Sequence, residues 1–250
     1  MNIASRTALV TGAGSGIGRV VALALAADGW TVHITGRRIA TLQETAAMGP
    51  RGRIWPFAAD IADESSVDAL FTSIAARSGR LDLLFNNAGV NVSKVPLDEL
   101  SSEELRSIID TNVWGAMLCA RAAIRQMKDQ KPCGGRIINN GSVSAYGPRL
   151  NTAAYTTTKH AITGLTKSLA LEGRSSNIVC GQIDIGNAAV ERTEYVQFGT
   201  AQADGTIAAE PRIDASHVGE AVCHMARLPL EANIPFMTLM ASAMPLYGRG

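Results

Sequence analysis

A tyrosine and a lysine stand four residues apart in the stretch AAYTTTKHA, as Tyr155 and Lys159. The alanines of this stretch and the run that follows predict a helix over residues 152–172, on which residues four apart share a face. A free tyrosine ionises at about pH 10 and is a poor acid–base catalyst at neutral pH, but a nearby ammonium favours its phenolate. The pair is therefore a candidate for moving a proton to or from a substrate oxygen.

Three threonines separate these two side chains, and helical geometry turns them away from the line that joins Tyr155 to Lys159. Threonine is a poor helix former because its branched β-carbon restricts the rotamers. The hydroxyls can bond preceding carbonyls or face packed neighbours, and the sequence leaves both options open.

A glycine-rich segment, TGAGSGIG, lies near the N-terminus between an expected strand at 7–11 and an expected helix at 16–28. Glycine permits a tight turn and a close approach of the backbone to a pyrophosphate, and the helix N-terminus offers free N–H groups. No Gly-Lys-Ser/Thr follows, which disfavours a P-loop NTPase. We therefore expect a dinucleotide phosphate site, with an ordinary glycine-rich turn as the alternative. Its residues are Gly12, Gly14, Ser15, Gly16, Ile17 and Gly18.

The end of the second expected strand bears on the choice of cofactor. A ribose 2′-hydroxyl is usually bound by Asp or Glu about 20 residues beyond the glycines, yet residues 31–43 contain no acid. Gly36, Arg37 and Arg38 instead leave space and positive charge for a 2′-phosphate. The sequence thus predicts NADP(H) in preference to NAD(H). The alternative is that both arginines begin a helix on a solvated surface.

Short β-rich runs alternate with longer helical runs almost to the C-terminus. The expected strands are 7–11, 31–35, 53–59, 81–87, 135–142, 177–185 and 235–241, and the expected helices are 16–28, 38–48, 64–77, 101–128, 152–172 and 215–227. Such strands and helices form right-handed βαβ crossovers and a parallel sheet covered on both faces. We expect one Rossmann-like, doubly wound α/β domain of about seven strands over 1–250, with a substrate-covering segment at about 187–213.

Composition excludes several classes of function. The net charge of +1 disfavours nucleic acid and anionic membranes as partners. No CxxC pair or Cys/His cluster is present, so we expect no metal site and no redox dithiol. The apolar stretch 20–27 is too short to cross a bilayer, and a strand starting near 7 leaves no room for a signal peptide. A cytoplasmic protein is expected, with these cysteines as buried thiols: Cys119, Cys133, Cys180 and Cys223.

Several motifs follow one another in a fixed order. TGAGSGIG is followed by Asp60-Ile61 after the third expected strand, and by NNAG at 86–89 after the fourth. NVWG at Asn112 lies in the long helix 101–128, and Ser142 follows the fifth strand, ahead of the tyrosine and the lysine. In these motifs the chain resembles the short-chain dehydrogenase/reductase family, from residue 7 to about 186. The resemblance implies an NAD(P)-dependent oxidoreductase that interconverts a secondary alcohol and a ketone by hydride transfer.

The family resemblance also implies a catalytic tetrad of Asn112, Ser142, Tyr155 and Lys159. Tyr155 would exchange a proton with the substrate oxygen, and Ser142 would hold that oxygen by a hydrogen bond. Lys159 would also bond the nicotinamide ribose, and Asn112 would fix a water that returns protons. Ser144 and Tyr146 lie in the same loop and are rivals for the roles of the serine and the tyrosine.

In such enzymes the remaining motifs hold the cofactor. Asp60, next to Ile61, would bond the adenine, the glycine loop would hold the pyrophosphate, and the ribose would be lined by Asn87, Ala88 and Gly89. Gly186 would lie near the nicotinamide. The resemblance further implies a homotetramer or a homodimer, formed partly through the helices at 101–128 and 152–172.

The chain departs from the family pattern after the sixth expected strand. Ile185-Gly186 stands where Pro-Gly is usual, position 190 is valine, and the nearest later threonine is Thr193. The preceding GQID at 181–184 is unusually polar for a buried strand. The apolar side chains of the covering segment identify no substrate; they are Val190, Tyr195, Phe198 and Ile207. A non-redox enzyme on the same scaffold and a non-catalytic dinucleotide-sensing regulator are the alternative functions.

Overall fold

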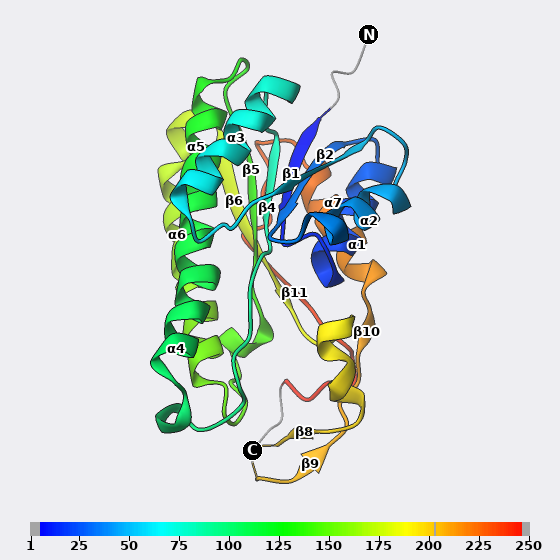
Figure 1. Cartoon of the computed structure of the whole chain (residues 1–250), viewed down its shortest axis with the longest axis vertical. Coiled ribbons are helices and arrows are strands. Elements are labelled where there is room, and N and C mark those ends of the chain that lie inside the picture. The colour runs from blue at the N-terminus through cyan, green and yellow to red at the C-terminus, as the bar shows by residue number, and fades with distance from the viewer. Residues whose placement is uncertain (1–5, 203, 247–250) are drawn as a thin grey trace.

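A computed structural model describes residues 6–202 and 204–246 and has a parallel seven-stranded sheet at its centre (Figure 1). The strands lie in the order β11-β6-β5-β4-β1-β2-β3. They are β1 (Thr7–Thr11), β2 (Thr31–Gly36), β3 (Ile54–Ala58), β4 (Leu83–Asn86), β5 (Gly135–Asn140), β6 (Ile178–Ile185) and β11 (Phe236–Leu239). The expected Rossmann-like fold is confirmed, and all seven expected strands are present.

Helices cover both faces of this sheet (Figure 1). One layer contains α1 (Gly16–Ala27), α2 (Ile39–Met48) and α7 (Ser216–Arg227), and the other contains α3 (Glu64–Ser78), α4 (Ser102–Ile109), α5 (Ala116–Asp129) and α6 (Ala153–Glu172). Because both faces are covered, a strand such as β1 is buried along its whole length. Apolar clusters on the two sides of the sheet form the core.

The strand order reverses beside β1, which pairs with β2 on one side and with β4 on the other. In an open parallel sheet the connections on the two sides of such a point lead to opposite faces, and a crevice opens at the carboxyl ends of the strands. The loops after β1, β4, β5 and β6 all begin at that end. The fold therefore gathers the sequence motifs at one edge of the sheet.

The predicted helix at 101–128 is divided into three parts. The Ser-x-x-Glu pattern of Ser101 and Glu104 forms a capping box at the start of α4, but residues Asp110–Gly115 (η2) form a π-helical turn before α5 begins. The widened turn buries Asn112 and brings Gly115 against Ile61, where a β-carbon would lie 2.8 Å from the isoleucine side chain. Both the burial of Asn112 and the close approach of Gly115 to Ile61 occur within this irregular turn.

The segment 187–213 consists of short pieces. It contains β7 (Ala188–Ala189), the 3₁₀ segment η5 (Glu191–Gln197), the antiparallel pair β8 (Thr200–Ala201) and β9 (Ile207–Ala208), and β10 (Ile213–Asp214). Of the four cysteines, Cys133 is only half-buried, which corrects the expectation that all four are buried.

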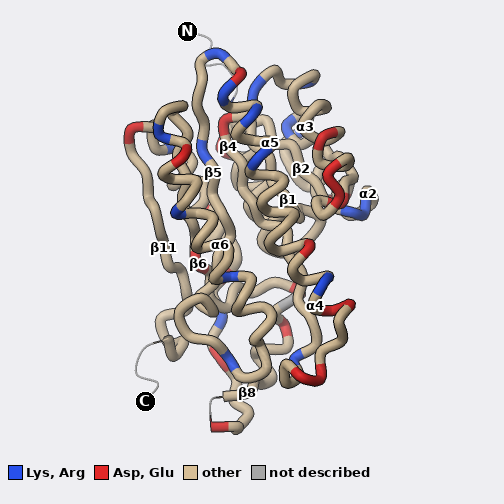
Figure 2. The backbone as a smooth tube through the Cα atoms, turned by 90° about the vertical axis from the view of Figure 1, so that its left-hand side faces the viewer, with Lys and Arg blue, Asp and Glu red and all other residues tan. Residues whose placement is uncertain are grey.

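Charged residues of both signs are interspersed along the chain in the view of Figure 2, in keeping with the net charge of +1. Within 6–202 and 204–246, no helix has both the length and the apolar composition that a membrane crossing requires. The same described ranges hold no group of three or more His, Cys, Asp or Glu side chains that could bind a metal ion.

Candidate active site

The glycine loop leads from the end of β1 into the first turn of α1. Gly12 and Gly16 have φ values of +67° and +55°, which favour glycine. A β-carbon on Gly18 would lie 2.3 Å from the carbonyl oxygen of Gly12, so a larger residue there would push the loop away from the helix. Ser15 is the N-cap residue, and its side chain makes no capping hydrogen bond. Free N–H groups at this helix end form an anion-binding cradle.

The ends of β1 and β4 are tied together beside this cradle. The Thr11 hydroxyl accepts hydrogen bonds from the main-chain N–H groups of Asn87 and Ala88, each at 2.9 Å. The side-chain amide of Asn87 donates to the Thr11 carbonyl at 2.8 Å. The NNAG motif therefore forms a wall of the same crevice that the glycine loop opens.

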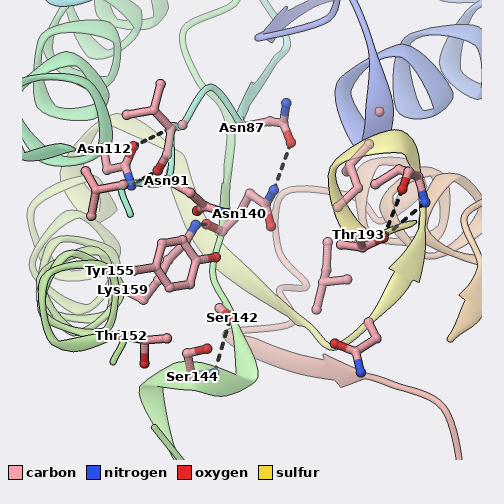
Figure 3. Close-up of a pocket in the computed structure, with 18 of the residues that line it drawn as sticks. Asn87, Asn91, Asn112, Asn140, Ser142, Ser144, Thr152, Tyr155, Lys159 and Thr193 are labelled. Atoms are coloured by element: carbon pink, nitrogen blue, oxygen red, sulfur yellow. Dashed lines mark hydrogen bonds between the residues drawn. The ribbon is translucent and has the colours of Figure 1, made fainter. Parts of the chain in front are cut away.

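One cleft runs from the glycine loop to the start of α6 (Figure 3). The structure brings thirteen of the predicted site residues into its lining: Gly12, Ser15, Gly16, Ile17, Gly18, Asn87, Ala88, Gly89, Asn112, Ser142, Tyr155, Lys159 and Gly186. The other five lie outside that lining: Gly14, Arg37, Arg38, Asp60 and Ile61.

Tyr155 and Lys159 project from α6 toward the same space (Figure 3). The Lys159 ammonium lies 5.6 Å from the centroid of the Tyr155 ring and donates a 2.7 Å hydrogen bond to the Asn140 carbonyl. The side chain of Asn140 in turn donates to the side-chain oxygen of Asn87 at 2.8 Å. Since Lys159 is only 9% exposed, its charge is fixed beside the tyrosine.

Asn112 is held from two directions. Its side-chain oxygen accepts from the main-chain N–H of Val90 at 2.7 Å, and its amide nitrogen donates to the Val90 carbonyl at 3.0 Å. The same nitrogen lies 3.3 Å from the hydroxyl of Thr158, which donates to the Tyr155 carbonyl at 2.7 Å. Thr158 thus links the π-helical turn to α6, which explains why a threonine is buried at this position of the helix. His160, the next residue of α6 after Lys159, is exposed.

Ser142 caps the 3₁₀ turn η3 (Val143–Ala145) that follows β5. Its hydroxyl oxygen accepts a 3.1 Å hydrogen bond from the main-chain N–H of Ser144, and it is 6% exposed. Ser144 lines the cleft as well, so proximity alone does not separate the two serines. Tyr146 is not part of the lining, and its hydroxyl donates to the buried carboxylate of Asp184.

The polar residues of β6 form a buried network beneath this turn. Asp184 is fully buried and accepts from the main-chain N–H of Ser142 at 3.0 Å and from the amide of Gln182 at 2.7 Å. Gln182 also accepts from Thr166 of α6 at 2.9 Å. A β-carbon at Gly141 would lie 1.9 Å from the Asp184 carboxylate, so this approach requires glycine. The unusually polar side chains of β6 therefore form hydrogen bonds with one another, with the Ser142 turn and with α6.

The far wall of the cleft is formed by residues after β6. Val190 and Tyr195 line it, whereas Phe198 and Ile207 are 79% and 69% exposed and do not. Thr193 also lines it, and its hydroxyl accepts from the Val190 N–H at 3.2 Å (Figure 3). Of the four apolar side chains expected to cover substrate, only two face the cleft.

The cofactor residues outside the lining differ in their surroundings. Arg37 and Arg38 are exposed and have no ion-pair partner in the part of the chain that the structure describes. Asp60 is exposed, and its carboxylate accepts from the Ala62 N–H at 3.0 Å. Gly14 faces α2 instead, where a β-carbon would lie 2.4 Å from the Thr41 hydroxyl oxygen.

The sequence that forms this cleft matches a known family. The family model described as short chain dehydrogenase matches residues 6–198. This chain belongs to the short-chain dehydrogenase family. It is accordingly an NAD(P)-dependent oxidoreductase, and its close-packed glycines, free N–H groups and continuous cleft suit a dinucleotide.

Individual short-chain dehydrogenases are similar to this one over most of its length. A 3beta-hydroxysteroid dehydrogenase of Mediterraneibacter gnavus is 35% identical over 182 residues, which are 70% of this chain and 63% of that relative. A 3-ketoacyl-(acyl-carrier-protein) reductase of Brucella melitensis, complexed with NADH, has a TM-score of 0.85 at 26% identity, covering 95% of this chain and 98% of that one. A closed form of serine dehydrogenase complexed with NADP+ has a TM-score of 0.80 at 27% identity, covering 94% of each chain.

Sequence reasoning missed several residues of this short-chain dehydrogenase that hold or line the cleft. They are Lys94, Asn140, Arg149, Thr158, Asp184 and Asn187. The polar GQID segment was a visible signal for Asp184, because charged residues are rarely fully buried without partners. The other five carry no distinguishing pattern, since their partners come from distant parts of the chain.

Proposed function

We propose that this chain is an NADP(H)-dependent oxidoreductase that interconverts a secondary alcohol and a ketone, with Tyr155 as the general acid and base. The observation that carries the proposal is the presence of Tyr155, Lys159 and Ser142 in one cleft with the glycine cradle. A sensor of dinucleotides needs the cradle alone and has no use for a tyrosine beside a buried ammonium.

The proposed steps follow from what each side chain can donate. A nicotinamide cofactor held at the glycine loop would supply or accept the hydride at the substrate carbon. In the direction of reduction, Tyr155 gives its hydroxyl proton to the carbonyl oxygen, and the Lys159 charge stabilises the phenolate that remains. Because the Ser142 hydroxyl accepts from the Ser144 N–H, its own hydrogen is free to bond that same oxygen.

Lys159 and Asn112 would serve the return of the proton. One N–H of the Lys159 ammonium is committed to the Asn140 carbonyl, and its other two are available to a ribose hydroxyl and to Tyr155. Asn112 lines the cleft and is 4% exposed, which supports its holding a water between Lys159 and solvent. The family motifs support the same assignment of roles.

The preference for NADP(H) rests on Arg37 and Arg38. Both guanidinium groups are exposed at the end of β2 and lack an ion-pair partner among the described residues, so they are available to a 2′-phosphate. Similar proteins are complexed with NADH in one case and with NADP+ in another, and an NAD(H)-preferring enzyme is therefore the alternative.

Assembly and location form the last part of the proposal. We place the protein in the cytoplasm as a homodimer or homotetramer joined through α4, α5 and α6. Exposed apolar side chains at the end of α4, in η2 and in α5 support the assembly, because Ile109, Trp114 and Met117 are 47%, 43% and 45% exposed.

The test of the proposed function compares the parent protein with Tyr155→Phe. Purified protein is mixed with NADPH and a panel of ketones, and oxidation of NADPH is followed by absorbance. The parent should reduce at least one ketone, and the variant should lose at least about 1,000-fold in kcat, because the general acid is gone. Binding of NADPH to both proteins is measured by fluorescence titration. If both bind it and neither reduces any compound, the proposed function is rejected in favour of a non-redox enzyme or a sensor.

A further inference from the structure

An arginine lies at the end of the cleft that contains Ser142 and Tyr155, which we call the substrate end. Arg149 lines it together with Ser142 and Tyr155. Thr152 fixes the main chain of Arg149, because the threonine hydroxyl donates to the Arg149 carbonyl at 2.7 Å and accepts from the Arg149 N–H at 3.2 Å. The arginine is therefore held four residues before Ala153, where α6 begins with the turn that carries Tyr155.

Two partners from the covering segment fix the head of this side chain. Nη2 of Arg149 donates to the side-chain oxygen of Asn187 at 3.0 Å and to the carboxylate of Glu210. Asn187 and Glu210 are 4% and 5% exposed, and the Asn187 amide also donates to Glu210, at 2.9 Å. The guanidinium is thus oriented in advance by a buried carboxylate and a buried amide.

These contacts leave most of the guanidinium's donors unused. The two bonds from Nη2 consume both of its hydrogens, and a guanidinium has five N–H groups. The three on Nε and Nη1 have no acceptor in the part of the chain that the structure describes. Arg149 is 16% exposed as a side chain and lines the cleft, so these donors are accessible to a bound molecule.

A second cation stands at the same end. Lys94, from the loop after β4, lines the cleft, donates to the Tyr195 hydroxyl and lies 3.9 Å from that ring's centroid. It has no ion-pair partner among residues 6–202 and 204–246. Glu210 pairs with Arg149, so Lys94 is the positive charge at this end for which the described residues supply no ion-pair partner.

Other charges of the cleft belong to its remaining parts. Glu191 lies on the cofactor side, with a carboxylate oxygen 3.9 Å from where a β-carbon of Gly16 would be. Lys159, which lines the cleft, and Asp184, buried beneath it, are opposite in sign at the catalytic end. The positive charge at the end of the cleft near Ser142 and Tyr155 therefore comes from Lys94 and Arg149.

We propose that Arg149 binds a carboxylate of the substrate, with Lys94 adding to the attraction, so that the enzyme acts on oxo acids and hydroxy acids. This inference rests on the proposed function. A carboxylate is an acceptor-only group and matches three unused donors and one excess charge, whereas a phosphate monoester at neutral pH carries about 1.5 to 2 negative charges. Arg149 is a substrate-binding residue and takes no part in the transfer of the proton.

The experiment compares acids with their neutral esters. Acetoacetate and 4-oxopentanoate, each beside its methyl ester, are titrated calorimetrically into the full chain with saturating NADP+ and, separately, with NAD+. The same four compounds are then tested as substrates of the protein in the presence of NADPH and, separately, of NADH. At least one acid should bind about 10-fold or more tightly than its ester, since hydrogen bonds to charged groups are worth about 1.5–3 kcal/mol.

Three variants separate binding from folding. Arg149→Lys keeps a cation beside Glu210, and Arg149→Met/Glu210→Gln removes both charges together, so neither leaves a buried charge unpaired. Both should weaken binding of the acid by about 10-fold or more and that of the ester by less than about threefold. Arg51→Met, at an exposed position beyond α2, should change neither the affinity for the acid nor that for the ester.

The outcomes are distinct for the two proposals. Equal affinity for acid and ester in the parent, or equal losses for both compounds in the Arg149 variants, overturns the carboxylate site. Selective, Arg149-dependent binding of an acid without turnover of any compound supports the site and rejects the proposed function.

Discussion

The main-chain N–H of Ser142 donates a 3.0 Å hydrogen bond to the fully buried carboxylate of Asp184. The other oxygen of the same carboxylate accepts from the hydroxyl of Tyr146, four residues further along the chain. One side chain of β6 therefore holds both ends of the turn that begins at Ser142. Among the described residues no salt bridge reaches this carboxylate, which depends on these donors and on Gln182.

Replacing this carboxylate should loosen the Ser142 turn. In Asp184→Asn one acceptor oxygen becomes an NH2 group, which cannot accept from Tyr146, so we expect kcat to fall about 10-fold while the Kd for NADPH stays within about twofold. Steady-state kinetics and fluorescence titration provide the two numbers. Tyr146→Phe, which removes one of the bonds, should fall between parent and Asp184→Asn. A lower melting temperature with unchanged kcat would show that Asp184 is structural only.

Thr158→Val should displace Asn112 with little change in shape. Valine keeps the volume of threonine but cannot accept from the Asn112 amide, so we expect a loss of about three- to tenfold in kcat, with proton return slowed. The solvent deuterium isotope effect on kcat should rise accordingly. Thr157→Val changes an exposed threonine in the same helix and is the matched control. Equal kinetics for the two variants would argue against a role of Thr158 through Asn112.

Arg37→Ala should change the choice between cofactors. If the Arg37 guanidinium contacts a 2′-phosphate, its removal raises the Kd for NADPH by about 10-fold or more and that for NADH by less than twofold, since NADH lacks the phosphate. Arg38→Ala should act in the same direction. Arg51→Ala changes an exposed arginine beyond α2 and should leave the ratio of the Kd for NADPH to the Kd for NADH unchanged. If this ratio is unchanged in both the Arg37 and the Arg38 variants, then either other residues select NADP(H) or the protein prefers NAD(H).

His33 should make the stability of the protein depend on pH. Burial within β2, and the charge of Arg77, lower the pKa of His33 from 6.5 to about 4. Between these values the unfolded chain takes up a proton that the folded chain refuses, so the free energy of unfolding falls as the pH falls from 6.5 toward 4. Below pH 4 both states are protonated, and the total loss is about 3 kcal/mol.

Urea unfolding of the parent and of His33→Gln at pH 7, 6, 5 and 4 measures this loss. The variant should show a flatter dependence, while His160→Gln, at an exposed position, should follow the parent. Parallel curves for the parent and His33→Gln would mean that other groups cause the decline.

The proposed assembly should be weakened by a charge on α5. Met117→Lys places an ammonium on an apolar surface that would be buried between copies, so light scattering after size exclusion should detect a shift toward the monomer. Met48→Lys, at a 63% exposed position on α2, is the control and should not shift. A parent protein that is already a monomer at micromolar concentration would reject the assembly.

The sequence by itself determined the framework. Hydrophobic runs, the glycine loop and the capping box at Ser101 are local signals, because propensity, turn geometry and capping act within a few residues. They placed seven strands, and they placed Tyr155 and Lys159 on one helical face. The widened turn around Asn112 was not visible in the same way, since its side chain is held by Val90 and Thr158 from other elements.

Only the tertiary structure decided which polar groups share the cleft and which are neutralised beneath it. Asp184 meets Ser142 across two strands, and Arg149 meets Glu210 across 61 residues of chain. Such pairings depend on the folded path of segments that are far apart in sequence, and burial then makes every unmatched donor or charge costly. For that reason the chemistry of the tyrosine–lysine pair could be inferred from the sequence, whereas the supports of the serine and the candidate carboxylate site required the structure.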